Sequence, residues 1–187
     1  QEQFGPLVVE EVDRINRIVQ NLLEFARPQA HKPGKVEITS ILERTHLLLE
    51  NRLQQRKIEV SWRMPSHDIP YVYGDSERLA QVFLNLMKNA MEALEDQPDA
   101  RLLEISVQDG DVQSRTSARE TLAVKIADNG PGIPPDNVPR IFDPFYSTKD
   151  EGTGLGLAIS YRLLTDIGAR IDVDTEEHQG TAFTITL

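Results

Sequence analysis

The sequence contains no cysteine, which excludes disulfide bonds and thiolate metal sites. It also lacks any apolar run near the ~20 residues that a membrane-spanning helix requires, and it shows no secretory signal peptide. Basic residues are in the minority, with 20 Lys and Arg against 30 Asp and Glu, and the net charge of −10 argues against a surface that binds nucleic acid. We therefore expect a cytoplasmic location and no nucleic acid partner.

What is present is ordinary for a globular protein. Hydrophobic residues make up 39% of the 187 residues and charged residues 27%, which fits one domain with an appendage. The chain begins at Gln1 and not at Met, so we expect it to be cut from a longer protein, which is either soluble or anchored in a membrane.

An amphipathic helix is predicted near the N-terminus, over residues 7–27. Its apolar residues recur in alternating steps of four and three, as in a helix that packs against other helices. These residues are Val8, Val12, Ile15, Val19, Leu22 and Ala26. Pro28 ends the helix, and residues 29–35 are predicted to be a linker. The helix packs either on the rest of the chain or, as one arm of a helical bundle, in a dimer.

The rest of the chain mixes strand and helix patterns. Helices are predicted at 40–56, 75–94 and 155–167, and strands at 36–38, 58–63, 71–73, 102–108, 121–127, 170–175 and 181–187. The pattern predicts an α/β (α+β) two-layer sandwich, in which about three helices cover a mixed, mostly antiparallel sheet.

The helix at 75–94 carries a polar stripe opposite its apolar face. Asn85 and Asn89 lie one turn apart in this stripe. Their amide oxygens suit Mg²⁺, which takes one or two protein oxygens together with phosphates and waters. The alternative is a solvated face, for which Asn is a poor choice because it is a mediocre helix former.

The segment DNGPGI at 128–133 follows an apolar strand pattern. Asp128 therefore ends a strand, where its carboxylate can accept a hydrogen bond from an amine such as adenine N6. Gly130 and Gly132 would let a base approach the backbone closely. A simple turn is the alternative interpretation.

The segment GTGLGL at 152–157 immediately precedes a helix. Its glycines free the backbone, so the first N–H groups of the helix can face phosphate oxygens, and Lys149 adds a cation nearby. The spacing matches neither the dinucleotide-binding fingerprint nor the GxxxxGK[ST] phosphate loop. Residues 134–151 between the glycine-rich segments are rich in Pro and polar residues, which suits a lid over a ligand.

Four segments in this order, QVFLNLMKNA, DNGPGI, FDPFYSTK and GTGLGL, resemble the N, G1, F and G2 boxes of sensor histidine kinases. The closing GTAFTITL resembles the terminal strand of that family, so the resemblance covers about residues 36–187. EVDRINRIVQNLLEFARP is similar to the second helix of the family's dimerisation and phosphoacceptor domain. NAMEAL and FYSTK are similar to members of the nitrogen-regulation type.

The resemblance implies that the chain binds Mg-ATP and transfers the γ-phosphoryl group to a histidine, for relay to a response-regulator aspartate. It implies Asn89 as the magnesium ligand and Asp128 as the reader of adenine. The implied catalytic residues are Asn85, Lys88, Asn89 and Lys149. The implied nucleotide-binding residues are Asn85, Asn89, Asp128, Gly130, Gly132, Ile133, Lys149, Gly152, Thr153, Gly154, Leu155, Gly156, Leu157 and Thr181.

The resemblance also implies three parts: a partial dimerisation helix at 1–28, a linker at 29–35 and an ATP-binding catalytic domain at 36–187. In the full-length protein, the implied partners are its own phosphoacceptor helix, a second copy of the chain and the receiver domain of a response regulator. A Lys-aromatic pair of many family members is replaced here by Glu92 and Ala93.

The phosphoacceptor histidine of the family lies in a His-Glu/Asp context on the first bundle helix. None of the histidines here has that context, so structural or surface roles are expected for His31, His46, His67 and His178. We therefore expect that the acceptor helix is missing and that this chain alone does not autophosphorylate.

Two other functions stay open. Related gyrase-, mismatch-repair- and chaperone-type ATPases carry a glutamate base where Asn85 stands, and an amide cannot accept the proton of an attacking water. This difference favours transfer over hydrolysis. A non-catalytic nucleotide-binding scaffold is the third hypothesis, against which the intact boxes argue.

Overall fold

The computed structural model describes Val12 and residues 32–95, 97–109, 121–149 and 152–187. The order of elements in these residues is β1–α2–β2–β3–α3–β4–β5–η1–α4–β6–β7. The predicted N-terminal helix, apart from Val12, lies outside the described residues, as do residues 29–31 of the predicted linker and residues 110–120.

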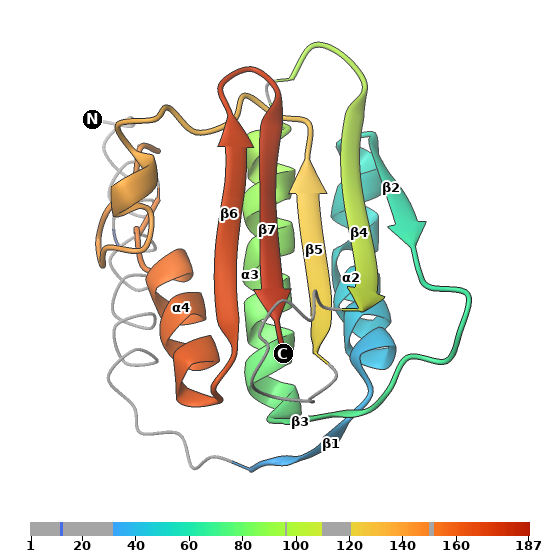
Figure 1. Ribbon diagram of the computed structural model, residues 1–187. Coiled ribbons are helices and arrows are strands. Elements are labelled where there is room, and N and C mark those ends of the chain that lie inside the picture. Colours follow the sequence, from blue (N-terminus) through green and yellow to red (C-terminus); the bar gives the residue numbers. More distant parts are fainter. Residues whose placement is uncertain (1–11, 13–31, 96, 110–120, 150–151) are drawn as a thin grey trace.

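A five-stranded sheet forms one layer of the fold, with the strand order β2–β4–β5–β7–β6 (Figure 1). Strand β2 pairs parallel with β4, and the other neighbours pair antiparallel. The strands are β2 (Ile58–Arg63), β4 (Arg101–Asp109), β5 (Leu122–Asp128), β6 (Arg170–Glu176) and β7 (Gly180–Thr186). The predicted mixed, mostly antiparallel sheet is confirmed.

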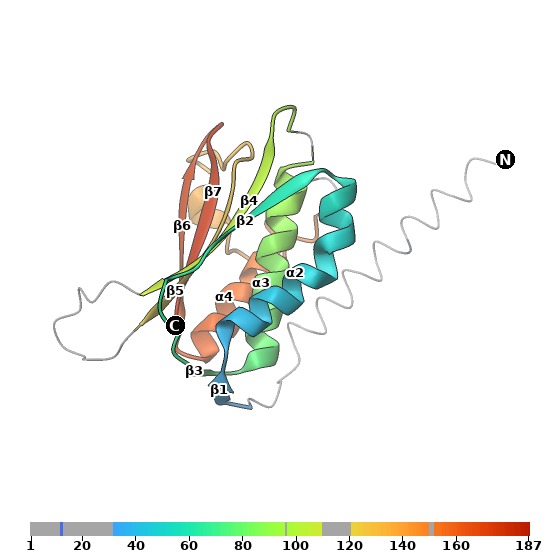
Figure 2. The ribbon, with the colours of Figure 1, turned by 90° about the vertical axis from the view of Figure 1, so that its right-hand side faces the viewer.

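Three helices form the second layer: α2 (Ile38–Gln55), α3 (Ser76–Ala93) and α4 (Gly156–Asp166). They all lie on the same face of the sheet, with α3 between the other two (Figures 1 and 2). The two-layer sandwich predicted from the sequence is therefore confirmed. None of the described helices combines the length and the apolar character needed to cross a bilayer.

The first strand starts earlier than predicted. Strand β1 (Gly34–Val36) pairs antiparallel with β3 (Val72–Gly74), whereas the sequence pattern placed a strand at 36–38 and assigned Gly34 to the linker. Its pairing with β3 supplies hydrogen bonds that no local pattern reveals. Helix α2 likewise begins two residues before the predicted start, at Ile38, whose side chain is completely buried.

Helix α3 occupies the centre of the core. The carboxylate of Asp75 caps it by accepting hydrogen bonds from the N–H groups of Glu77 (3.1 Å) and Arg78 (3.2 Å), a common role for Asp at this position. The apolar face of the helix is buried, namely Leu79, Val82, Phe83, Leu86 and Ala90. Arg78 is buried as well, and its Nη1 lies 3.0 Å from Asp166 Oδ2 of α4. This contact fixes α4 beside α3.

The short 3-10 helix η1 (Val138–Arg140) lies within the predicted lid. Arg140 stacks on the ring of Tyr146, 4.3 Å from its centroid, and Tyr146 Oη donates to Asn137 Oδ1 at 2.7 Å. Phe142 packs against Tyr161 of α4, with 5.4 Å between ring centroids. The segment between the glycine-rich stretches is thus folded onto α4.

Candidate functional site

Both glycine-rich segments meet the polar stripe of helix α3. A Cβ atom on Gly156 would lie 2.4 Å from Asn85 Oδ1, and one on Gly130 would lie 3.2 Å from the carbonyl oxygen of Ala93. Asn89 is one helical turn from Asn85 and one turn from Ala93. The two segments therefore bracket Asn89 along the helix, although they lie far from it in sequence.

The Asn85 side chain is tied to helix α4. Its Nδ2 donates to Ser160 Oγ at 2.9 Å, and that hydroxyl in turn donates to the carbonyl oxygen of Gly156 at 3.1 Å. Ser160 is buried, so this chain of hydrogen bonds holds the first turn of α4 against α3. The predicted contact of Asn85 with a nucleotide stays a prediction. Sequence reasoning did not identify Ser160, whose only signal is a hydroxyl on the buried face of a helix.

Asn89 and Lys88 are half-buried on α3. No residue in the described part of the chain hydrogen-bonds the Asn89 amide. The described residues also contain no group of three His, Cys, Asp or Glu that could hold a metal. A cation beside Asn89 would therefore use one amide oxygen and the oxygens of a ligand and water, a donor set that Mg²⁺ accepts.

Asp128, the last residue of β5, is the acid of the site. Burial raises the pKa of Asp128 to about 6, while hydrogen bonds from the Gly130 and Thr181 backbone and the charge of Lys149 lower it. The Gly130 N–H donates to Asp128 Oδ1 at 2.9 Å. At neutral pH, the ionised form prevails and can accept a further hydrogen bond from a ligand.

The loop after Asp128 is anchored to β4 by Asn129. Its Oδ1 accepts the N–H of Leu102 at 2.8 Å, and its Nδ2 donates to the carbonyl oxygen of Ala100 at 2.7 Å. Gln97 Nε2 donates to the Asn129 carbonyl oxygen at 3.1 Å. The sequence showed only a turn-forming residue here, because this role depends on which residues of β4 lie alongside.

Two glycines allow this loop to touch the turn between β6 and β7. Gly132 has φ +71°, and a Cβ atom on it would lie 2.1 Å from the Glu176 carbonyl oxygen. Gly180 has φ +114°, and its Cβ would lie 2.0 Å from the Asp128 carbonyl oxygen. Glycine is required at both positions because any side chain would separate the backbones. Approach of a base to Gly132 stays a prediction, and Gly180 was not predicted at all.

Two threonines complete the strand end. Thr175 Oγ1 accepts the N–H of Ile133 at 2.9 Å and donates to the Gly180 carbonyl oxygen at 3.0 Å. Thr181 Oγ1 lies 3.1 Å from the same hydroxyl, and Thr181 pairs with Asp128 across β5 and β7. Thr181, a predicted residue, thus lies beside Asp128, and the predicted residue Ile133 is joined to the same turn through Thr175, which was not predicted.

The second glycine-rich segment packs on the predicted lid. Gly154 has φ +64°, and a Cβ atom there would lie 2.4 Å from the carbonyl carbon of Phe145. Leu155 is completely buried at the start of α4, and Leu157 packs against the core. Thr153 is half-buried between the glycines. Of these predicted residues, the two leucines fix the segment in the core.

The predicted phosphate partner Lys149 contacts helix α3. Its Nζ lies 2.6 Å from Glu92 Oε2, and both side chains are partly exposed. Lys149 therefore lies at the rim of the site, while Lys88 is on α3 itself.

Two of the described histidines, His46 and His67, lie apart from these residues, whereas the backbone N–H of His178 donates to the Pro131 carbonyl oxygen at 2.7 Å. His46 packs edge-on against the tryptophan of β2, with 5.5 Å between ring centroids. His67 Nε2 lies 2.9 Å from Asp109 Oδ2, and hydrogen bonds to the next carbonyl and to Asp109 raise its pKa. His178 lies in the turn between β6 and β7. These positions fit the predicted structural or surface roles, and His31 lies outside the described residues.

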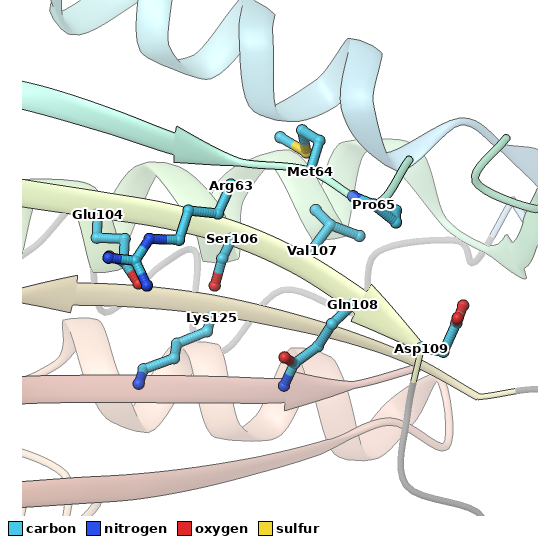
Figure 3. Close-up of a pocket in the computed structure, with 9 residues that line it drawn as sticks. All are labelled: Arg63, Met64, Pro65, Glu104, Ser106, Val107, Gln108, Asp109 and Lys125. Carbon is cyan, nitrogen blue, oxygen red and sulfur yellow. The ribbon is translucent and has the colours of Figure 1, made fainter. Parts of the chain in front are cut away.

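A separate hollow of about 360 Å³ (Figure 3) lies on the face of the sheet opposite the described helices, which cover only one face (Figure 2). It is lined by Arg63, Met64, Pro65, Glu104, Ser106, Val107, Gln108, Asp109 and Lys125. Arg63 Nη2 pairs with Glu104 Oε2 at 2.9 Å. None of the predicted site residues lines this hollow, because the sheet separates it from the helix layer.

Residues 74–187, more than half of the chain, match a protein family described as histidine kinase-, DNA gyrase B- and HSP90-like ATPase. Over 182 residues, the chain is 35% identical to the sensory histidine kinase/phosphatase NtrB of Rhizobium leguminosarum bv. phaseoli. The matched region is 94% of this chain and 46% of that protein, so the chain spans less than half of that relative's length.

Solved structures share the fold. The catalytic domain of the histidine kinase ThkA superposes with a TM-score of 0.68 at 26% identity, covering 85% of this chain and 95% of that one. Full-length ShkA, solved in complex with AMPPNP, gives a TM-score of 0.79 at 29% identity, covering 100% of this chain and 38% of that one.

Proposed function

Because this chain belongs to the family of histidine kinase-, DNA gyrase B- and HSP90-like ATPases and is homologous to sensor histidine kinases, we propose that it binds Mg-ATP for phosphoryl transfer. The γ-phosphoryl group would pass to a histidine of the dimerisation domain in the full-length kinase. The observation that carries this proposal is the bracketing of Asn89 by the two glycine-rich segments. An acid, Asp128, lies beside one segment, and the N-terminus of α4 follows the other.

The purine is assigned to the strand end. The Asp128 carboxylate would accept a hydrogen bond from adenine N6, worth roughly 1.5–3 kcal/mol because the acceptor is charged. Its Oδ1 already accepts the Gly130 N–H, which orients the carboxylate before a ligand arrives. Thr181, paired with Asp128, lies next to the base in this arrangement.

The phosphates are assigned to the other end of the α3 stripe. The first N–H groups of α4 have no partner within the helix and can face phosphate oxygens. Lys149 and Lys88 would add positive charge, which a chain of net charge −10 needs for a polyanionic ligand. Asn89 would hold the magnesium ion, which neutralises phosphate charge when bound.

Transfer is favoured over hydrolysis by Asn85. Its Nδ2 donates to Ser160, so the side chain is held on α4 and offers no carboxylate to activate water. Catalysis then consists of positioning and charge neutralisation, with a histidine as the nucleophile. The three parts at 1–28, 29–35 and 36–187 would supply the dimerisation helix, the linker and the catalytic domain. A response regulator would receive the phosphoryl group.

The test is calorimetric titration of the chain with a nonhydrolysable ATP analogue, with and without Mg²⁺. Saturable binding that weakens when Mg²⁺ is withdrawn is expected, and absence of binding under both conditions would reject the proposal. With radiolabelled ATP, the chain should release phosphate only slowly and should label an added dimerisation domain that bears the acceptor histidine. Rapid phosphate release would favour the hydrolysing alternative instead.

A further inference from the structure

One contact at the rim involves a residue to which the proposed function gives no role. Glu92 follows Asn89 by three residues on α3, and its Oε2 lies 2.6 Å from Lys149 Nζ. The two side chains are 45% and 46% exposed, so a ligand can reach both. The charge of Lys149 also lowers the pKa of Asp128. The ammonium is therefore within electrostatic range of the acid at the strand end as well as of Glu92.

The backbone of Lys149 is held by hydrogen bonds to Ser147 and Gly152. Its N–H donates to Ser147 Oγ at 3.0 Å, and its carbonyl oxygen accepts the N–H of Gly152 at 3.1 Å. A Cβ atom on Gly152 would lie 2.2 Å from Ser147 Oγ and 3.2 Å from Lys149 Cβ, so a side chain there would crowd both residues. The part of Lys149 that is free to change partner is thus its long side chain.

We propose that Glu92 is a positioning residue that holds the Lys149 ammonium at the rim and competes for it with the phosphates of the nucleotide; this rests on the proposed function. An exposed ion pair contributes little stability, so a phosphate, which carries more charge, can replace the carboxylate. Glu92 therefore weakens the binding of phosphate-bearing nucleotides and leaves recognition of the base unchanged.

The experiment compares the wild-type chain with Glu92→Gln by calorimetric titration of a nonhydrolysable ATP analogue. The variant should bind about two- to fivefold more tightly, the range expected for release of one exposed ion pair. Glu92→Asp retains the charge and should stay closer to the wild type. Glu95→Gln is the matched control, because Glu95 makes a comparable exposed ion pair with Arg56 at 3.0 Å. Its affinity should equal that of the wild type.

Two further titrations distinguish competition for Lys149 from an effect on base binding and from direct repulsion of the phosphates by Glu92. Adenosine, which has no phosphate, should bind wild-type and Glu92→Gln equally, and tighter binding of adenosine to the variant would overturn the proposal. In a Lys149→Met background, Glu92→Gln should no longer raise affinity for the ATP analogue. An equal gain in both backgrounds would show direct repulsion by Glu92 and would also overturn it, as would no gain in the wild-type background. Failure of the wild type to bind the analogue at all rejects the proposed function itself.

Discussion

The strand end around Asp128 and the rim around Lys149 are held together by different kinds of contact. At the strand end, hydrogen bonds from Asn129 and Thr175 join β4, β5 and the turn between β6 and β7. At the rim, Lys149 is held by an exposed ion pair with Glu92. Three of these four hydrogen bonds are partly buried and are more costly to leave unmade than an exposed ion pair is to exchange. The strand end, to which we assign the base, is therefore preformed, and the rim, to which we assign the phosphates, keeps a group that a ligand can recruit.

The largest expected effect tests the preformed end. Gly180→Ala should lower the free energy of unfolding by about 2–4 kcal/mol, because it adds both φ strain and a clash with the Asp128 carbonyl oxygen. Urea denaturation would measure this loss. Gly168→Ala is the control, since Gly168 also has a positive φ (+76°) but open space around it, and about 1 kcal/mol is expected there. Equal losses at both positions would mean that the close approach contributes nothing to the strand end.

The next effect concerns ligand affinity at the same end. Asp128→Asn should weaken binding of a nonhydrolysable ATP analogue by roughly tenfold to a hundredfold, because the amide loses the charged acceptor for adenine N6. Asp136→Asn, at an exposed position nearby in sequence, should leave the affinity unchanged. If calorimetry gives the wild-type affinity for Asp128→Asn, the strand end does not read the base.

A pH dependence follows from the raised pKa of Asp128. Because the value rises from 3.8 to about 6 on folding, the folded chain holds this proton more tightly than the unfolded chain. The carboxyl therefore stabilises the fold fully below 3.8, and this contribution is lost as the pH rises through about 6. Affinity for the ATP analogue should change in the opposite direction and increase as Asp128 ionises.

The comparison with Asp128→Asn isolates this titration, because the phosphates of the ligand titrate equally in both experiments. The ratio of the two affinities should grow between about pH 5 and 7 and then level off. A ratio that stays constant over this range would contradict the assignment of the charged acceptor to Asp128.

The smallest expected effect concerns the contact between α3 and α4, the region to which we assign the phosphates. Ser160→Ala should lower the free energy of unfolding by about 1 kcal/mol, since it removes the buried partner of the Asn85 amide. In a double-mutant cycle with Asn85→Ala, the double mutant should lose less stability than the sum of the losses of the two single mutants. Thr165→Ala removes an exposed hydroxyl from the same helix and should change stability less. Additive losses in the cycle would show that the two side chains do not act together.

Much of the fold could be predicted from the sequence because its signals are local. The apolar residues of α3 recur every three to four residues, and its Asp75 cap bonds N–H groups within the first turn. Both signals are therefore visible in the sequence without knowledge of what the helix packs against. Strand β1 was placed two residues late because its position depends on its pairing with β3. The family boxes located most of the candidate site, although the individual roles of those residues stay predictions.

The sequence by itself identified the candidate site residues: an acid at the end of a strand, two asparagines one turn apart and two glycine-rich segments. Only the tertiary structure decided what those residues touch. Gly180 beside Asp128, Ser160 beside Asn85 and Glu92 beside Lys149 are contacts between residues far apart in the chain. Strand register and helix packing create such contacts. A period of two or of 3.6 residues specifies which side of an element is buried, but not which neighbour lies against it.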